Sequence, residues 1–124
     1  MSLIALGSSL SLLAAAAPPP IISDVAMFER VAIDSDLEFY TIGVLDDTRC
    51  SDRELCVRDE KLVVAAVVID GRRRTGVTLE LGVPLRIASG TLTLVSTTAV
   101  PRLYGAIPLR EYGLTYVFER DRKS

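Results

Sequence analysis

The sequence predicts an all-β fold, a single antiparallel β-sandwich or small barrel of six to seven short strands. Apolar and β-branched residues gather in short segments, turn residues separate those segments, and no stretch requires a long helix. The length of 124 residues fits one domain. We expect a signal peptide at 1–16, a Pro-rich spacer at 17–22, the β-sandwich domain at 23–120 and a charged tail at 121–124.

The first half of the domain contains the longest strand patterns. Val25–Val31 fits a short helix or a first strand, and we predict a strand because the rest of the chain is all-β. Leu37–Leu45 is rich in aromatic and β-branched residues, and its alternation places one set on a common face: Leu37, Phe39, Thr41 and Leu45. Leu62–Ile69 is an unbroken run of eight apolar residues. Such a run predicts a central strand covered on both faces.

Turn residues divide the second half into shorter strands. Asp70-Gly71 predicts a turn with three arginines at its tip. Alternation after this turn predicts a strand with four inward residues: Thr75, Val77, Leu79 and Leu81. Further patterns predict an edge strand, a Thr-rich strand, a loop and a last strand, at Pro84–Ile87, Thr91–Thr98, Pro101–Pro108 and Leu114–Glu119.

The N-terminal segment has the character of a secretion signal. Leu3–Ala17 is apolar, uncharged and ends in small residues, and Ala14 and Ala16 fit the small-x-small rule for cleavage before Ala17. No Lys or Arg precedes the apolar run, so an N-terminal membrane anchor or an unstructured apolar tail stays an alternative. The run is short for a bilayer span. Export therefore predicts a periplasmic or secreted protein with no stable membrane span after cleavage.

The only two cysteines, Cys50 and Cys56, lie in a dense cluster of charged residues. An even cysteine count in an exported chain predicts a structural disulfide. A loop of about seven residues stabilises by roughly 2–2.5 kcal/mol in the chain-entropy model. Redox-active pairs are usually closer in sequence, and a zinc site needs two more ligands of the Cys or His type. We favour the structural disulfide over both alternatives.

Composition excludes several classes of function. The net charge of −2 gives no basic excess for nucleic acid. The chain has no histidine, which excludes His-based catalytic triads and His-ligated zinc. No base occurs in a recognisable catalytic motif. We therefore expect no cofactor and no enzymatic activity.

The charged residues around the cysteines have two interpretations. Carboxylates could bind calcium, and the candidate ligands are Asp46, Asp47, Asp52 and Asp59. Arginines interleave with these carboxylates and would neutralise their field, so we favour a solvated loop with local ion pairs. Within it, Asp47 accepting backbone N–H groups and Arg49 donating to carbonyls or a carboxylate are expected to brace the loop.

Two other groups are candidate contacts for a ligand or partner. Arg72, Arg73 and Arg74 could bind an anion, although arginines at a hairpin tip commonly keep an apolar strand soluble. Tyr104 and Tyr112 flank glycines and could form an adaptable contact surface. The alternative is that each tyrosine closes one end of the core.

The cysteine segment resembles a family of small bacterial exported proteins. Their motif reads Asp-Ser-Arg-Cys-Pro and, after a short gap, Cys-Val-Trp-Ala-Gly; here Asp47-Thr48-Arg49-Cys50 and Cys56-Val57 match it. The chain departs from the motif at Ser51, Arg58 and Glu60, where the family has Pro, Trp and Gly. The resemblance implies a secreted or periplasmic β-sandwich. The family has no established activity, so the resemblance implies no function.

Together these observations predict a non-enzymatic binding or structural module of the cell envelope. Its expected partner is an envelope protein or a glycan, and not a nucleic acid. A calcium-stabilised module is the first alternative, and a small hydrolase with a carboxylate or serine centre is the second.

Overall fold

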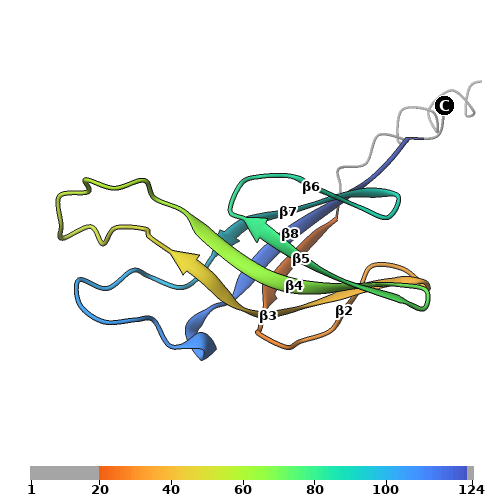
Figure 1. Cartoon of the computed structure of the whole chain (residues 1–124), viewed down its shortest axis with the longest axis horizontal. Coiled ribbons are helices and arrows are strands. Elements are labelled where there is room, and N and C mark those ends of the chain that lie inside the picture. The colour runs from red at the N-terminus through yellow and green to blue at the C-terminus, as the bar shows by residue number, and fades with distance from the viewer. Residues whose placement is uncertain (1–19, 123–124) are drawn as a thin grey trace, which may run out of the picture.

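Eight strands form two four-stranded antiparallel sheets in the computed structural model, which describes residues 20–122 (Figure 1). Sheet A has the strand order β1 (Ile21–Val25), β8 (Leu114–Arg120), β7 (Gly90–Thr97) and β6 (Leu85–Ile87). Sheet B has the order β2 (Val31–Ala32), β3 (Leu37–Asp47), β4 (Leu62–Asp70) and β5 (Arg73–Glu80). The all-β prediction is confirmed. Of the two predicted architectures the sandwich is observed, because neither described sheet closes into a barrel.

The N-terminal predictions need correction. The signal peptide lies outside the described residues, but β1 begins at Ile21, inside the predicted spacer. The predicted strand Val25–Val31 is wrong, because a turn separates the end of β1 from the start of β2. In this turn Phe28 has a φ of 66°, and its N–H donates to the carbonyl of Thr41 at 2.7 Å. That left-handed conformation is incompatible with a continuous strand, and the turn carries the chain from sheet A to sheet B.

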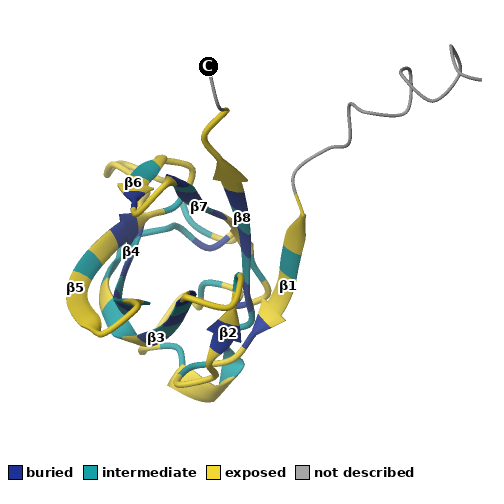
Figure 2. Cartoon of the chain, turned by 90° about the vertical axis from the view of Figure 1, so that its right-hand side faces the viewer, coloured by how far each residue is buried: buried dark blue, intermediate teal, exposed yellow. Residues whose placement is uncertain are grey.

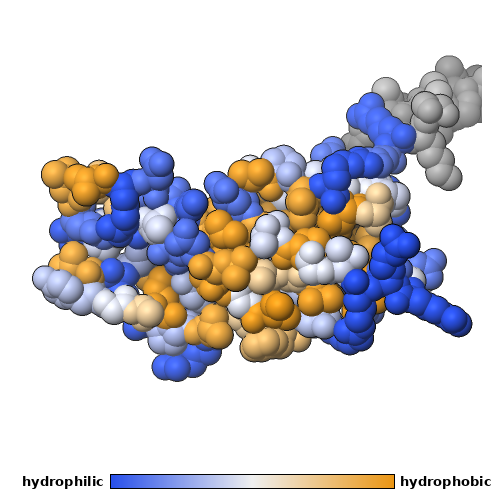
Figure 3. All heavy atoms as spheres, viewed as in Figure 1, coloured by the Kyte–Doolittle hydropathy of each residue, from blue (hydrophilic) through white to orange (hydrophobic). Residues whose placement is uncertain are grey.

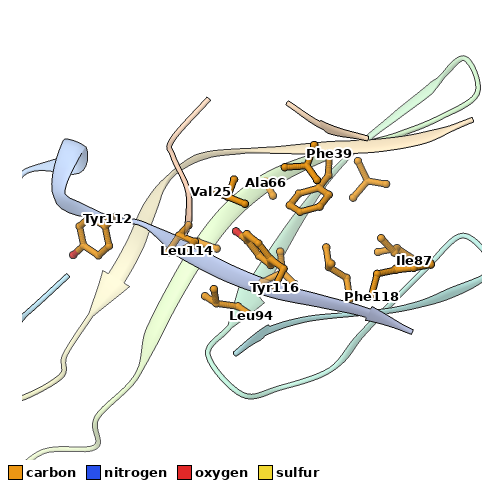
Figure 4. Packing of buried hydrophobic residues seen from close by; sticks show 14 of the residues in the cluster. Val25, Phe39, Ala66, Ile87, Leu94, Tyr112, Leu114, Tyr116 and Phe118 are labelled. Atoms are coloured by element: carbon orange, nitrogen blue, oxygen red, sulfur yellow. The ribbon is translucent and has the colours of Figure 1, made fainter. Parts of the chain in front are cut away.

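The core lies between the two sheets, where the inner sides of the strands are buried (Figure 2). Phe39 of β3 and Tyr116 of β8 meet edge to face, with ring centroids 4.8 Å apart (Figure 4). The Tyr116 hydroxyl also shares a 2.6 Å hydrogen bond with the hydroxyl of Thr41, and both residues are fully buried. This pair joins sheet A to sheet B and leaves neither hydroxyl without a partner.

Two register shifts in β3 change which residues face the core. They lie between Thr41 and Gly43 and between Val44 and Asp46. A β-bulge adds one residue to a strand and so moves the following side chains to the opposite face. Leu45, predicted inward, is 59% exposed, whereas Val44 packs against the core. The alternation rule was wrong here because it assumes an unbroken pleat.

β4 is central in sheet B but is covered on one face only. Its inner residues are buried: Leu62, Val64, Ala66 and Val68. The residues that point to its outer side are only partly buried: Val63, Ala65, Val67 and Ile69. The prediction that both faces are covered is wrong, because a two-layer sandwich provides one partner layer for each sheet.

The hairpin between β4 and β5 is shorter than predicted. Its turn contains Gly71 and Arg72, so the next two arginines lie in β5 itself. Along this edge strand Leu79 is buried and Val77 is partly buried, but Thr75 is exposed. Thr75 is opposite the buried Val68 and so lies on the inner side as predicted, but it stays exposed because the hairpin end of an edge strand has few neighbours to cover it.

The remaining strands follow the predicted pattern closely. β7 buries Leu92 and Leu94, and β8 buries alternate residues: Leu114, Tyr116 and Phe118. Between these strands residues 98–113 form a long connection that contains a short 3₁₀ helix, η2 (Leu109–Glu111). This connection includes the predicted loop and lies at the same end of the sandwich as the cysteine segment (Figure 1).

Candidate functional site

A cleft of about 570 Å³ lies between two loops at one end of the sandwich. The first, residues 48–61, joins β3 to β4 and is called the disulfide loop. The second, residues 98–113, joins β7 to β8 and is called the β7–β8 loop. Both project from the left end of the molecule in Figure 1. The cleft combines apolar side chains with polar ones, and its larger members are Leu45, Asp47, Arg49, Arg58, Arg102, Leu103, Ile107, Leu109 and Tyr112.

The disulfide predicted between Cys50 and Cys56 is formed, with 5.7 Å between the two Cα atoms. The backbone N–H of Cys50 donates to the Glu60 carboxylate at 2.8 Å. The Thr48 hydroxyl donates to the Asp59 carbonyl at 2.7 Å and accepts from the Lys61 N–H at 3.0 Å. These bonds hold the two ends of the disulfide loop together across its base.

Arg58 is a further brace of the disulfide loop. Its Nε donates to the Thr48 carbonyl at 2.9 Å, and its Nη2 donates to the Arg49 carbonyl at 3.2 Å. The same guanidinium lies 3.3 Å from the Glu54 carboxylate. The resemblance left open whether Arg58 replaces the family's Trp by packing its stem. In this chain its charged end makes the contacts, which residue type alone did not reveal.

Asp47 and Arg49, the two residues expected to brace the loop, form a bidentate ion pair at the base of the cleft. Arg49 donates to Asp47 through Nε at 2.8 Å and through Nη2 at 2.9 Å. Arg49 also donates to the Ala99 carbonyl at 3.0 Å, and the Tyr112 hydroxyl donates to Asp47 at 2.6 Å. The cluster therefore ties the end of β3 to both ends of the β7–β8 loop.

The environment of this cluster fixes its charges. Partial burial disfavours the charged carboxylate of Asp47, but the hydrogen bonds from Arg49 and Tyr112 outweigh it and hold the pKa of Asp47 below its ordinary value. The hydrogen bond to Asp47 raises the pKa of Arg49. Burial, and then the bond to Asp47, raises the pKa of Tyr112 to about 12. At neutral pH the cluster is a carboxylate, a guanidinium and a neutral phenol.

The two loops also carry the most exposed large apolar side chains of residues 20–122. These are 71–86% exposed: Leu55, Val57, Val100 and Tyr104. Leu55 and Val57 stand among charged residues of the disulfide loop, and hydrophobic surface is visible at the free end of that loop (Figure 3). Concentrated exposed apolar surface commonly marks a site of contact with another molecule. Apolar residues inside a charged loop are the sequence signal that could have indicated this surface.

The predicted contact residues do not come together. Tyr104 is 86% exposed on the β7–β8 loop, but Tyr112 is 4% exposed. Tyr112 lines the cleft, but its ring packs in the core and its hydroxyl is bonded to Asp47, as in the alternative that it closes one end of the core. Arg72, Arg73 and Arg74 belong to the β4–β5 hairpin, at the end of the sandwich opposite the cleft (Figure 1).

The four aspartates considered for calcium are not gathered into a site in the described part of the chain. Asp47 is bonded to Arg49 and Tyr112, and Asp46 lies 3.8 Å from the Lys61 ammonium. Among residues 20–122, the grouping of possible metal ligands is Cys50, Cys56 and Glu60. Its two sulfur atoms are joined in the disulfide and are not thiolate ligands.

Comparisons with known proteins add no assignment. No family model matches the chain, and no curated protein and no solved structure matches it. The resemblance at the cysteine segment therefore stays a prediction. Within residues 20–122, no helix has the length and apolar character needed to cross a membrane.

Proposed function

We propose that this protein is an exported, non-enzymatic binding module of the cell envelope, and that the cleft between its two loops holds the partner. The observation that carries the proposal is that the cleft lies between the two loops that carry the most exposed apolar side chains of the described residues, although those four side chains do not line the cleft themselves. Loops on a rigid sheet scaffold are a common place for binding residues. Here the disulfide and the Asp47–Arg49–Tyr112 cluster stiffen the base of both loops, which lowers the entropy lost on binding.

The chemistry of the cleft favours binding over catalysis. The pKa of Asp47 is lowered and that of Tyr112 is raised to about 12, so both lie far from neutral pH. A general acid or base works best when its pKa is near the working pH. The absence of histidine in the whole sequence removes the usual alternative. These points support a non-enzymatic role over the small hydrolase.

Export is supported by the disulfide together with the signal-like N-terminus. A disulfide in a small β-domain is compatible with an oxidising compartment such as the periplasm or the exterior. Secretion would place the two exposed loops in contact with envelope components. Recovery of unprocessed chain with two free thiols from the cytoplasm would contradict this part of the proposal.

The expected partner is an envelope protein, bound through an apolar segment, and not a glycan. The walls of the cleft include the aliphatic side chains of Leu45, Leu103, Ile107 and Leu109. Its single aromatic lining residue, Tyr112, is buried and offers no stacking platform for a sugar. Aliphatic walls with a few polar groups suit apolar side chains of a protein partner.

The test is crosslinking and pull-down from the envelope fraction with the oxidised chain as bait, quantified by mass spectrometry. Leu109→Ser removes an apolar wall of the cleft, where Leu109 is 45% exposed. The matched control is Val95→Ser on β7, because Val95 is 43% exposed and does not line the cleft. We expect a partner that the wild type and the control capture equally and that Leu109→Ser loses.

A second pair of variants compares the loss of an arginine ion pair at the cleft with the loss of a similar pair elsewhere on the surface. Arg102 lines the cleft and donates two bonds to Glu111, at 2.6 and 2.8 Å. Arg86 makes the same kind of pair with Asp121, at 2.6 and 2.8 Å, away from the cleft. Arg102→Ala should weaken capture and Arg86→Ala should not. Equal capture by both cleft variants and both controls would exclude the cleft as the binding site.

The calcium-stabilised module has weaker support, since its candidate ligands are separated or bonded to cations. We expect millimolar calcium and a chelator to give the same melting temperature. A rise with calcium that Asp46→Asn abolishes would restore this alternative.

A further inference from the structure

The outer face of sheet B is an apolar surface without a covering layer. It consists of the partly buried outer residues of β4 together with their outward neighbours on β3 and β5: Val63, Ala65, Val67, Ile69, Tyr40, Gly43, Gly76 and Thr78. Residues opposite one another on antiparallel strands point to the same side of the sheet, which defines this set. Figure 3 shows apolar residues across the middle of the molecule, over β3, β4 and β5.

β4 has the composition of a strand buried on both faces. Its eight apolar residues from Leu62 to Ile69 contain no polar side chain that would suit a solvated face. The two glycines beside it, Gly43 and Gly76, have open space where a Cβ would lie. They keep the centre of the face flat, so another flat sheet can approach it closely.

The charges at the two ends of this face are opposite in sign. Arg74 is opposite Ile69 at one end of β5, and Glu80 is opposite Val63 at the other end. Arg74 donates to the Tyr40 hydroxyl at 3.1 Å, which directs it over the face. Neither Arg74 nor Glu80 forms an ion pair with another of residues 20–122.

The other charges near the face are paired within the chain. Glu38 lies 2.6 Å from Arg30 at the end that holds Arg74. Asp46 lies 3.8 Å from Lys61 at the end that holds Glu80. Arg74 and Glu80 are therefore the two charged side chains of this face without an ion pair among residues 20–122. They lie about 20 Å apart along β5, since a strand rises about 3.3 Å per residue.

We propose that the outer face of sheet B is the interface of a symmetric dimer of this chain. A two-fold axis in the plane of the interface, crossing the strands at the level of Ala66 and Val77, reverses the strand direction. Ala66 and Val77 are register partners midway between the charged ends. The axis therefore sets Arg74 of each copy opposite Glu80 of the other and packs the apolar centre against itself. Self-complementarity is the requirement for a closed two-fold dimer.

The size of the face indicates a reversible dimer. Three strands spaced about 4.8 Å apart over seven residues cover roughly 350 Å² on each copy. This area is less than half of the roughly 800 Å² per partner of a standard interface, so the dimer should be weak. Two sheets pack face to face about 10 Å apart, a distance at which Arg and Glu side chains can meet.

The first test is sedimentation velocity of the oxidised chain from about 1 µM to about 1 mM, with Val67→Lys as the disrupting variant. This lysine would place two unpaired ammonium groups in each dimer, so the dissociation constant should rise at least about 100-fold. Val95→Lys on β7 is the matched control and should leave self-association unchanged. Circular dichroism and the melting temperature establish that both variants are folded.

The second test uses charge reversal. Arg74→Glu alone sets like charges opposite each other at both ends of the dimer, as does Glu80→Arg alone. Each should raise the dissociation constant roughly 10-fold. A mixture of the two variants should form a heterodimer of wild-type affinity, since every like pair becomes an opposite pair. A merely structural role of either side chain would not produce this rescue.

Three outcomes would overturn the dimer. They are a wild-type chain that stays monomeric up to about 1 mM, self-association that Val67→Lys leaves unchanged, and charge variants that do not complement each other. The cleft variant Leu109→Ser should dimerise as the wild type does, so this proposal and the proposed function can fail independently.

Discussion

Replacing Asp47 by Asn tests the cluster that holds the two cleft loops together. The amide is the same size as the carboxylate but carries no charge. Its NH₂ group replaces Oδ2, the oxygen that accepts hydrogen bonds from Arg49 and Tyr112, and an NH₂ group cannot accept them. Two charge-assisted hydrogen bonds are lost, one from Arg49 and one from Tyr112. Arg49 keeps its bond to the Ala99 carbonyl, so its guanidinium is not left entirely without partners.

The expected loss follows from burial and bond count. The side chains of Asp47 and Arg49 are 13% and 14% exposed. Breaking a fully buried ion pair costs about 3–5 kcal/mol, and each charge-assisted bond contributes about 1.5–3 kcal/mol. Because water in the cleft can solvate part of Arg49, we expect a loss of about 2–4 kcal/mol. In a domain of this size that loss lowers the melting temperature by about 10–25 °C.

The assay is chemical denaturation followed by circular dichroism, with Asp121→Asn as the control. Asp121 accepts bonds from Arg86 at 2.6 and 2.8 Å, but this pair is on the surface. Exposed pairs stabilise little, so the control should not differ measurably from the wild type. If both variants lose the same stability, the cluster is not a brace and the reasoning is wrong.

The pH dependence provides a second readout. The folded pKa of Asp47 lies below its ordinary value, so its stabilisation is present above the ordinary pKa of about 3.9. It is lost as pH falls through the folded pKa. The Asn variant has no carboxylate to protonate, so the stability gap between the two proteins should close in acid. A gap that is constant from pH 7 to pH 2 would contradict the role of the charge.

Four further predictions concern the core, the phenols and the disulfide. Tyr116→Phe leaves the Thr41 hydroxyl buried without its partner and should cost about 1–3 kcal/mol in denaturation. Burial raises the pKa values of Tyr116 and Tyr112 to about 12, so absorbance at 295 nm should show these phenols ionising at higher pH in the folded protein than in the unfolded one. The two neutral phenols stabilise the fold below pH 10, and this stabilisation is lost as pH rises towards 12. Gly90→Ala should cost about 1–3 kcal/mol, because its Cβ would lie 2.4 Å from a ring carbon of β8, whereas Gly76→Ala meets nothing within 4 Å and should cost far less. Reducing the disulfide should cost roughly 2–2.5 kcal/mol, reversed by reoxidation.

Periodicity predicted the strands wherever the pleat was regular. The alternation in β7 and β8 identified their buried residues, because side chains of an unbroken strand alternate strictly between two faces. The same rule misplaced Leu45, because one register shift in β3 precedes it and a second lies at Leu45 itself, between Val44 and Asp46. Bulges depend on how a strand pairs with its neighbour, which local sequence does not specify.

The candidate site was predictable only in part. Cys50 and Cys56 were identified as a disulfide because they are the only cysteines, and Asp47 and Arg49 were expected as braces because of their place beside the loop. The contribution of Tyr112 was not predicted. It lies 65 residues from Asp47 in sequence, and nothing local indicates that β8 begins beside the end of β3.

By itself the sequence determined the all-β fold class, the disulfide and the absence of histidine chemistry, because each depends on residue type or local spacing. Tertiary structure decided the rest. It brought the disulfide loop and the β7–β8 loop to one end of the sandwich, buried Tyr112 against Asp47, and left one apolar face of β4 uncovered. The cleft and the face follow from the packing of two sheets, and a contact between distant segments is a property of that packing and not of any one segment.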